Sequence, residues 1–173
     1  AQTLGWRRTA CRLALSLGKL SGADVEAALR WLDQAAKMAK RGDVAARAEI
    51  LERRGAMLFG AGLTPQGEAA WKEAVQLLEG AEEGRSRAAS ARMQCTLAGL
   101  KGDLVAAFAL GESAVELARE HQPSESMTVL VLFGRAAVRA GKIRRGRTAF
   151  QEAAERASLA GSATHSGLAL VNL

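Results

Sequence analysis

The residues that most often do chemistry are few in this sequence, and their spacing does not suit a reaction centre. Cys11 and Cys95 are 84 residues apart, and neither His121 nor His165 stands at a ligand spacing from them. These four side chains therefore do not predict a zinc site. Cys95 occupies a position where small residues recur, which favours a packed side chain over a nucleophile. We expect neither a metal site nor a catalytic cysteine.

Paired acidic residues and glycine-rich turns also lack the surroundings that catalysis or phosphate binding needs. Glu82 and Glu83 are adjacent, and adjacent side chains on a helix do not face one site. The stretch GAGLTPQG, residues 60–67, lacks the Lys-Ser/Thr ending and the preceding strand of a phosphate loop. The sequence therefore predicts a protein that is not an enzyme and that needs no cofactor.

The composition indicates a helical globular chain. The 173 residues are 49% hydrophobic and 24% charged, with no Tyr and two Pro, and helix-forming residues dominate. No apolar run approaches the roughly 20 residues that cross a membrane, so we expect a cytoplasmic protein without a membrane partner. The net charge is +6, but the basic residues are scattered and aromatic stacking platforms are missing. We therefore expect no nucleic-acid partner.

One spacing of small and bulky residues occurs four times along the chain. In the stretch GEAAWKEAVQLLE, the anchors Gly67, Trp71 and Ala74 share one helix face. About 39 or 40 residues apart, the same spacing returns at Ala28, Leu32 and Ala35, at Ala107, Gly111 and Ala114, and at Gly146, Phe150 and Ala153. Gly111 interrupts the bulky position, and we expect Phe108, one turn earlier, to fill the gap.

A second small residue precedes each first anchor by twelve positions, at Ser16, Gly55, Cys95 and Gly134. Small residues on both helices allow a tight antiparallel pair. Asp24, Thr64 and Asp103 are the expected N-caps of second helices, and Pro65 fits the first helical position. The sequence thus predicts one helical-repeat domain over residues 1–173, with four helix pairs and the start of a further helix at about 8–43, 44–84, 85–123, 124–162 and 163–173.

These positions resemble the tetratricopeptide repeat over about residues 8–162. The small residue of the family's first helix and the Ala, bulky, Ala trio of its second helix correspond to the positions named above. The resemblance implies an all-α fold, a right-handed αα-superhelix of stacked antiparallel pairs. The unit here is longer than the family's roughly 34 residues, and HEAT-like units also run to about 40. Long units of this kind resemble those of large bacterial signalling and transcriptional regulators.

A repeat array without catalytic residues indicates a protein–protein interaction scaffold that binds a peptide or a neighbouring domain in its concave groove. The repeat geometry places Glu52, Arg92, Thr96, Arg135 and Arg139 along that groove. Arginine holds a carboxylate through two hydrogen bonds, so the three arginines favour an acidic protein or peptide partner, with Glu52 opposing them. The alternative is that they pair with glutamates of neighbouring helices and contact only water.

Three further points stay open at the level of sequence. The chain can instead be a ligand-sensing or self-association segment of a bacterial signalling or transcriptional regulator. The absence of an initiator Met indicates a fragment of a larger protein, and the apolar residues 166–173 predict self-association through uncapped ends. The basic cluster RAGKIRRGR, residues 139–147, is either a solvated edge or a functional surface.

Overall fold

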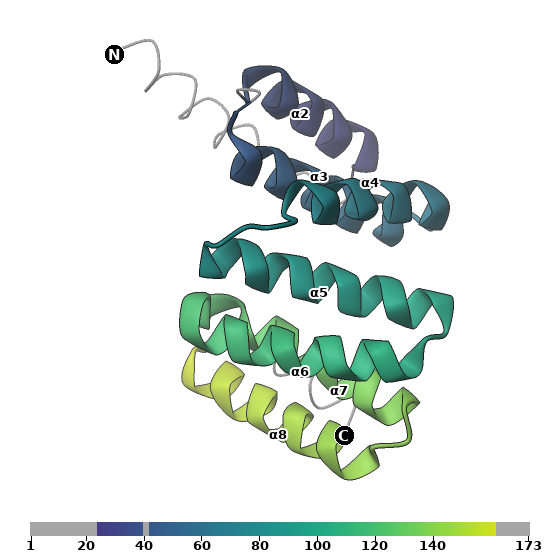
Figure 1. The fold of residues 1–173 in the computed structure, drawn as a ribbon, viewed down its shortest axis with the longest axis vertical. Helices are drawn as coiled ribbons and strands as arrows, with labels where there is room; N and C mark the ends of the chain where they lie inside the picture. The colour runs from purple at the N-terminus through teal and green to yellow at the C-terminus, as the bar shows by residue number, and fades with distance from the viewer. Residues whose placement is uncertain (1–23, 40–41, 162–173) are drawn as a thin grey trace. The chain divides into compact units, whose positions relative to one another are not determined.

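The computed structural model describes residues 24–39 and 42–161, and its regular structure is helical (Figure 1). The elements in chain order are α2 (Val25–Met38), α3 (Val44–Gly60), α4 (Thr64–Leu77), α5 (Gly84–Lys101), α6 (Leu104–His121), the 3₁₀ turn η1 (Pro123–Glu125), α7 (Ser126–Arg139) and α8 (Ile143–Leu159). No strand occurs in the described residues, so the all-α prediction is confirmed for them. The first helix of the first pair and the helix expected from residue 163 lie outside these residues, as do Cys11, Ser16 and His165.

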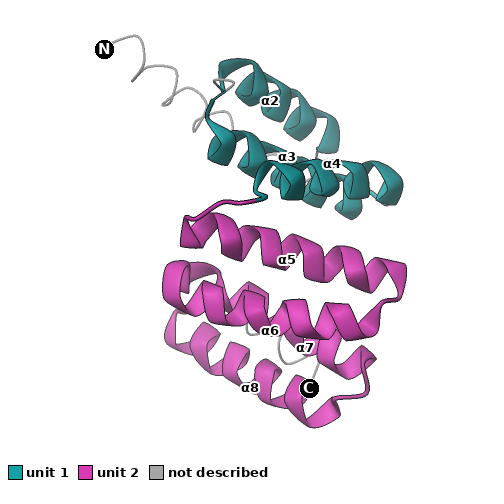
Figure 2. Cartoon of the chain, in the orientation of Figure 1, with its two compact units in different colours: residues 1–79 teal, residues 80–173 magenta. Residues whose placement is uncertain are grey.

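The chain divides into two compact units, residues 1–79 and 80–173 (Figure 2). In the first unit α3 packs against both α2 and α4, and Leu32, Ala35 and Ile50 form a buried cluster between α2 and α3. In the second unit α5, α6, α7 and α8 pack in sequence, and α5 also lies against α7. None of the described helices is long and apolar enough to cross a membrane.

Three of the seven described α-helices, α2, α3 and α6, start at a residue whose side chain caps the helix. The carboxylates of Asp24 and Asp103 accept hydrogen bonds from backbone N–H groups three residues on, at 2.9 and 3.0 Å, so both predicted N-caps are confirmed. Thr64 was the wrong choice for α4, because it is the first helical residue and the N-cap is Leu63. The main-chain oxygen of Leu63 already accepts the first helical bond, at 3.0 Å from the nitrogen of Gly67.

A left-handed glycine ends the first helix of each described pair. Gly62, Gly102 and Gly141 have φ of 76°, 79° and 75°, a region that costs glycine little and other residues more. The residue after each glycine donates its N–H to a carbonyl five residues earlier, at 2.8, 3.0 and 2.8 Å. This is the Schellman pattern, which satisfies carbonyls at the helix end and turns the chain into the second helix.

The repeated anchors form the buried faces of their helices, as the spacing predicted. All twelve are buried, and the last residue of each trio, Ala35, Ala74, Ala114 and Ala153, is 0% exposed. The small residue in the first helix of a pair is required for a direct steric reason. A Cβ at Gly55 would lie 2.2 Å from the Trp71 ring, and one at Gly134 would lie 2.4 Å from the Phe150 ring.

In the third pair, the space left by the glycine at the bulky position, Gly111, is not filled by Phe108 as predicted. A Cβ on Gly111 would lie 3.0 Å from Phe133 of α7 and 3.4 Å from Sγ of Cys95, so these side chains occupy the space over the glycine. Phe108, the expected filler, instead packs against Phe133 with the ring centroids 5.5 Å apart. The gap is filled from the next pair because Phe133 projects from a helix that packs directly on α6.

Candidate partner-binding face

The predicted groove residues are divided between the two compact units. Glu52 lies on α3 in the first unit, whereas Arg92 and Thr96 lie on α5 and Arg135 and Arg139 lie on α7, all in the second. The four residues of the second unit therefore lie on two helices that pack against each other. The expectation that Glu52 opposes the arginines stays a prediction, since Glu52 belongs to the other compact unit.

Two rows of side chains run along α5 and α7. Residues four apart lie on one face of a helix, so the rows are Arg92, Thr96 and Leu100 on α5, and Val131, Arg135 and Arg139 on α7. We call the exposed and half-buried members of these rows the α5–α7 face. Val131 is buried, at 7% exposure, and does not contribute to it. Leu100 is 45% exposed and was not among the predicted residues.

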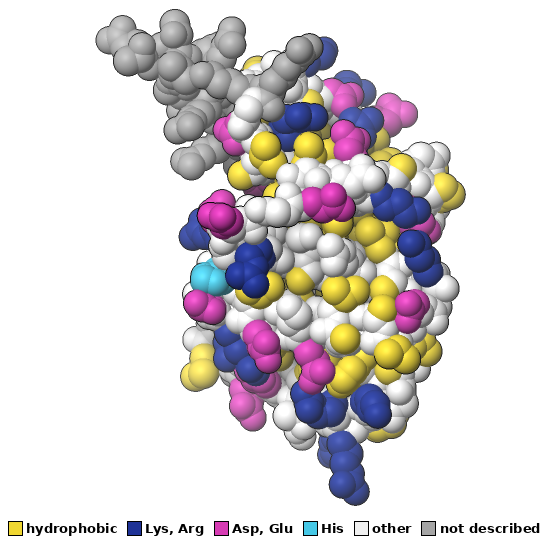
Figure 3. Space-filling model, viewed as in Figure 1, with side chains coloured by type: hydrophobic (Ala, Val, Ile, Leu, Met, Phe, Trp, Pro, Cys, Tyr) yellow, Lys and Arg dark blue, Asp and Glu magenta, His cyan; other side chains and the backbone are white. Residues whose placement is uncertain are grey.

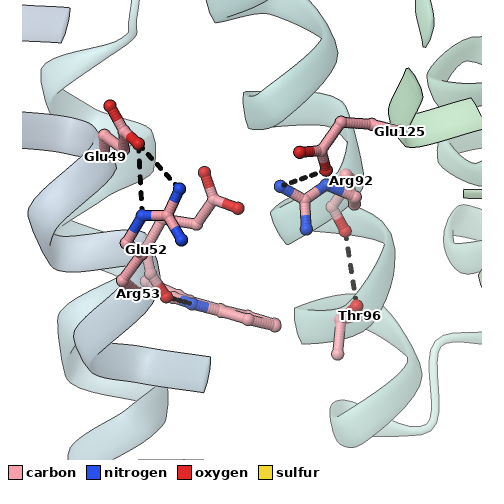
Figure 4. A network of polar contacts seen from close by, with 7 residues as sticks. Glu49, Glu52, Arg53, Arg92, Thr96 and Glu125 are labelled. Carbon is pink, nitrogen blue, oxygen red and sulfur yellow. Dashed lines mark hydrogen bonds and ion pairs between the residues drawn. The ribbon is translucent and has the colours of Figure 1, made fainter. Parts of the chain in front are cut away.

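One end of this face carries an internal ion pair. A guanidinium nitrogen of Arg92 lies 4.0 Å from a carboxylate oxygen of Glu125, in the 3₁₀ turn before α7 (Figure 4). The Arg92 side chain is 17% exposed and that of Glu125 is 48% exposed. The hydroxyl of Thr96, one turn further along α5, donates to the main-chain oxygen of Arg92 at 3.3 Å. Arg92 therefore already has a carboxylate of its own chain beside it.

The opposite end is held together by Arg139. Its Nη2 donates to the main-chain oxygen of Gly99, near the C-terminus of α5, at 2.9 Å. A Cβ on Gly99 would lie 3.3 Å from Nη1 of Arg139, so the bare backbone lets the guanidinium approach closely. A cation at the C-terminal end of a helix is favourable because carbonyls without helical partners carry partial negative charge there.

The three arginines form a row and not a single cluster. Arg92 pairs with Glu125 at one end of the face, whereas the Arg139 guanidinium is held at Gly99, seven residues or about 10 Å further along α5 at roughly 1.5 Å per residue. Arg135 and Arg139, by contrast, are one turn apart, about 6 Å along the axis. Of the predicted arginines, this pair is the one that can hold neighbouring carboxylates.

In the first unit, Glu52 is fixed through its backbone. Its main-chain oxygen accepts a hydrogen bond of 2.7 Å from Nε1 of Trp71, the bulky anchor of α4. The neighbouring Arg53 pairs with Glu49 one turn earlier, at 2.8 Å (Figure 4). The Trp71 hydrogen bond joins α4 to α3, whereas the Arg53–Glu49 pair lies within α3, and neither contact involves the Glu52 carboxylate.

Sequence reasoning missed Glu125 and Leu100 as parts of the face. Leu100 stands 39 residues before Arg139 and was therefore findable from the repeat spacing alone. Glu125 had no such signal, because it lies in the 3₁₀ turn between pairs, outside the repeated helices. Its approach to Arg92 depends on how α5 and α7 pack against each other.

The other surface of the second unit is occupied by ion pairs between second helices. Arg145 of α8 pairs with Glu112 of α6, and Arg119 of α6 pairs with Glu152 of α8 at 2.6 Å. Acidic and basic side chains consequently lie side by side over α6 and α8 (Figure 3). Part of the basic cluster at residues 139–147 therefore has a structural role, through Arg139 and Arg145.

The residues first considered for chemistry have packing roles where they are described. The thiol of Cys95 is 1% exposed and donates to the main-chain oxygen of Ala107 at 3.2 Å. Burial raises the pKa of Cys95 to about 11, so the thiol is protonated near neutral pH and is a poor nucleophile. His121 stands 3.6 Å from the carboxylate of Glu120 and fills the space beside Gly84. Among the described residues no three potential ligands gather into a metal site.

The chemistry that the α5–α7 face offers is therefore recognition of carboxylates by arginine. Its exposed members are charged or apolar, namely Arg135, Arg139 and Leu100, and one carboxylate, that of Glu125, already lies at its edge. This interpretation depends on the geometry itself, because no family model and no curated protein matches the chain.

Proposed function

We propose that this chain is a non-catalytic interaction scaffold of the tetratricopeptide-like kind and that its α5–α7 face binds an acidic segment of a protein partner. In this proposal the helix pairs continue as a right-handed superhelix of four pairs, with the first helix of each pair on the concave side. The observation that carries the proposal is the exposed pair Arg135 and Arg139, one turn apart on α7, a helix that packs against α5.

The contacts at the two ends of the face support an acidic partner. Glu125 is half exposed next to Arg92, so a carboxylate is already accommodated at one end. Arg139 uses one guanidinium nitrogen for Gly99, and a planar guanidinium has further N–H groups to offer a ligand. Residues of the first helices of successive pairs therefore contribute to one surface, as a scaffold requires.

The test is direct binding of a labelled peptide with two glutamates in a Gly/Ser background, followed by fluorescence anisotropy. We expect binding that weakens with salt and that is lost for the same peptide with glutamine in place of glutamate. An exposed ion pair contributes up to about 1 kcal/mol. Loss of two such pairs in Arg135→Glu with Arg139→Glu should therefore lower the affinity by up to about 30-fold.

The matched control is Arg144→Glu with Arg147→Glu, which changes the net charge equally on exposed residues of α8. This control should keep the affinity within about two-fold, and both variants should keep the helical circular dichroism of the parent. Equal weakening by both double variants would mean that the peptide senses only the overall charge. Failure of the parent to bind the glutamate peptide would also refute the proposed acidic partner.

A further inference from the structure

The second unit has an edge that combines exposed aliphatic side chains with basic ones. The α5–α6 turn and the α7–α8 turn lie at the same end of this unit (Figure 1), and the Arg139–Gly99 hydrogen bond joins them. We call residues 100–105 and 138–147 the turn edge. It holds four of the eight large hydrophobic residues that are exposed in the described chain, namely Leu100, Val105, Val138 and Ile143.

The charge of the turn edge is almost entirely positive. Its basic residues are Lys101, Arg139, Lys142, Arg144, Arg145 and Arg147, and its one acidic residue is Asp103. The carboxylate of Asp103 is committed to capping α6, through the backbone nitrogen of Ala106. Arg139 and Arg145 have the intramolecular contacts described above, and the other four basic residues are exposed.

The start of α8 is arranged against the ordinary preferences of a helix. Lys142 is its N-cap and makes no side-chain capping bond, and the first turn contains no acidic residue. Basic side chains at this end meet the positive pole of the helix dipole, which disfavours them. The equivalent position before α6 carries the capping residue Asp103, so the same fold accepts the stabilising choice. A local choice that lowers stability is expected where a surface has a function.

The exposed aliphatic residues of the turn edge also lower the stability of the fold, so their presence is not explained by folding. Val105 is 82% exposed and Ile143 is 57% exposed, each in the first turn of its helix. Both are β-branched, and such residues favour helices less than Ala or Lys does. Their apolar surface faces water and is not buried in the core, so it contributes no hydrophobic stabilisation to the fold.

The geometry points to contact of the turn edge with an anionic lipid surface. Aliphatic side chains that project from helix ends can enter the boundary between headgroups and acyl chains, and Lys and Arg then meet the lipid phosphates. A second copy of the edge would place like charges opposite each other. Nucleic acid would leave the aliphatic residues unused, since its bases stack on aromatic rings. The contact is at the membrane surface and needs no spanning helix, so this proposal departs from the expectation, drawn from the short apolar runs, that the chain has no membrane partner.

The first test measures sedimentation of the chain with vesicles of phosphatidylcholine, with and without roughly a third phosphatidylserine. We expect binding to the anionic vesicles only. Lys142→Asp changes the local charge by two units, from +1 to −1. Each unit contributes about five-fold to the affinity for an anionic surface, so binding should weaken about 25-fold. The same change supplies α8 with an N-cap, so the denaturation midpoint should rise while binding falls. Misfolding would move both readouts downward.

The matched control is Arg85→Asp, which places the same charge change in the first turn of α5, at the opposite end of that helix. This variant should bind within about two-fold of the parent. The apolar contribution is tested with Val105→Ser and Ile143→Ser together, against Leu159→Ser at the other end of α8. The double serine variant should lose most of the binding, and Leu159→Ser should not, although Leu159 is 90% exposed.

Three results would overturn the proposal. The first is equal binding to neutral and anionic vesicles, and the second is no binding to either. The third is equal weakening by Lys142→Asp and Arg85→Asp. If an acidic amphipathic peptide binds in a manner that depends on Val105 and Ile143, and vesicles do not bind, then the edge is a protein-binding site and the lipid assignment is wrong. Arg135 and Arg139 are unchanged in all these variants, so the outcome is separate from that of the peptide-binding proposal.

Discussion

Adding one methyl group to Gly134 tests how closely the helices of a pair must approach. In the structure a Cβ at this position would lie 2.4, 2.7 and 2.8 Å from three atoms of the Phe150 ring. Phe150 is 2% exposed, so its ring has no solvent-facing space to move into. The substitution Gly134→Ala must therefore push α7 and α8 apart or force the ring out of its rotamer.

Two effects of opposite sign decide the magnitude. Alanine is better than glycine in a helix interior by about 1 kcal/mol. Overpacking a tight site costs about 1–3 kcal/mol, and contact with three ring atoms places this site in the upper part of that range. We therefore expect Gly134→Ala to lower the free energy of unfolding by about 1–2 kcal/mol. At roughly 2–4 °C per kcal/mol for a chain of this size, the melting temperature falls by about 2–8 °C.

The matched control is Gly60→Ala, which makes the same chemical change at the end of α3. No atom lies within 4 Å of a Cβ built there, so only the helix-propensity gain applies and the stability should stay equal or rise. Both variants are measured by urea denaturation followed at 222 nm. Trimming the ring with Phe150→Leu should make Gly134→Ala less harmful than it is in the parent. Equal stability of Gly134→Ala and Gly60→Ala would refute the close-approach argument.

Three other predictions follow from the same contacts. Ala114→Leu should destabilise by about 1–3 kcal/mol because Ala114 is fully buried, whereas Arg85→Ala should stay within about 0.5 kcal/mol; equal urea midpoints would contradict this. Asp103→Ala should cost about 1 kcal/mol in thermal denaturation through loss of the α6 cap, and Asp103→Asn much less. In a Cys11→Ser background, Cys95 should resist a thiol reagent at pH 8 until urea unfolds the chain. Burial raises the pKa of Cys95 from its ordinary value of 9.0 to about 11 in the folded chain. The stability from its burial is therefore present below pH 9 and is lost as pH rises toward 11, which urea midpoints compared with those of Cys95→Ala will show.

Much of the local structure was determined by the sequence. The spacing of Ala28, Leu32 and Ala35 repeats in α4, α6 and α8, and every one of these positions is buried. Such a prediction succeeds because three- and four-residue spacing fixes which side chains share a helix face, wherever the helix lies. Asp24 and Asp103 were identifiable for a similar reason, since capping involves residues only three positions away.

The sequence predicted which helix positions make up the candidate site, but it did not predict the contacts that their side chains make. Repeat equivalence placed Thr96 and Arg135 on successive first helices, and α5 and α7 do lie side by side. The same equivalence did not predict that Arg92 meets Glu125 or that Arg139 binds the main-chain oxygen of Gly99. Arginine side chains are long and reach neighbouring helices, so their partners depend on how those helices are offset.

Only the tertiary structure decided how the irregular third pair is completed. The sequence has a glycine at position 111 and offers Phe108, three residues earlier, as the local side chain to fill the gap. The folded chain uses Phe133 of α7, twenty-two residues further on, to occupy that space. A periodic pattern specifies the faces of individual helices, whereas the filling of a gap depends on which helix packs over it, and that neighbour is set only when the whole unit folds.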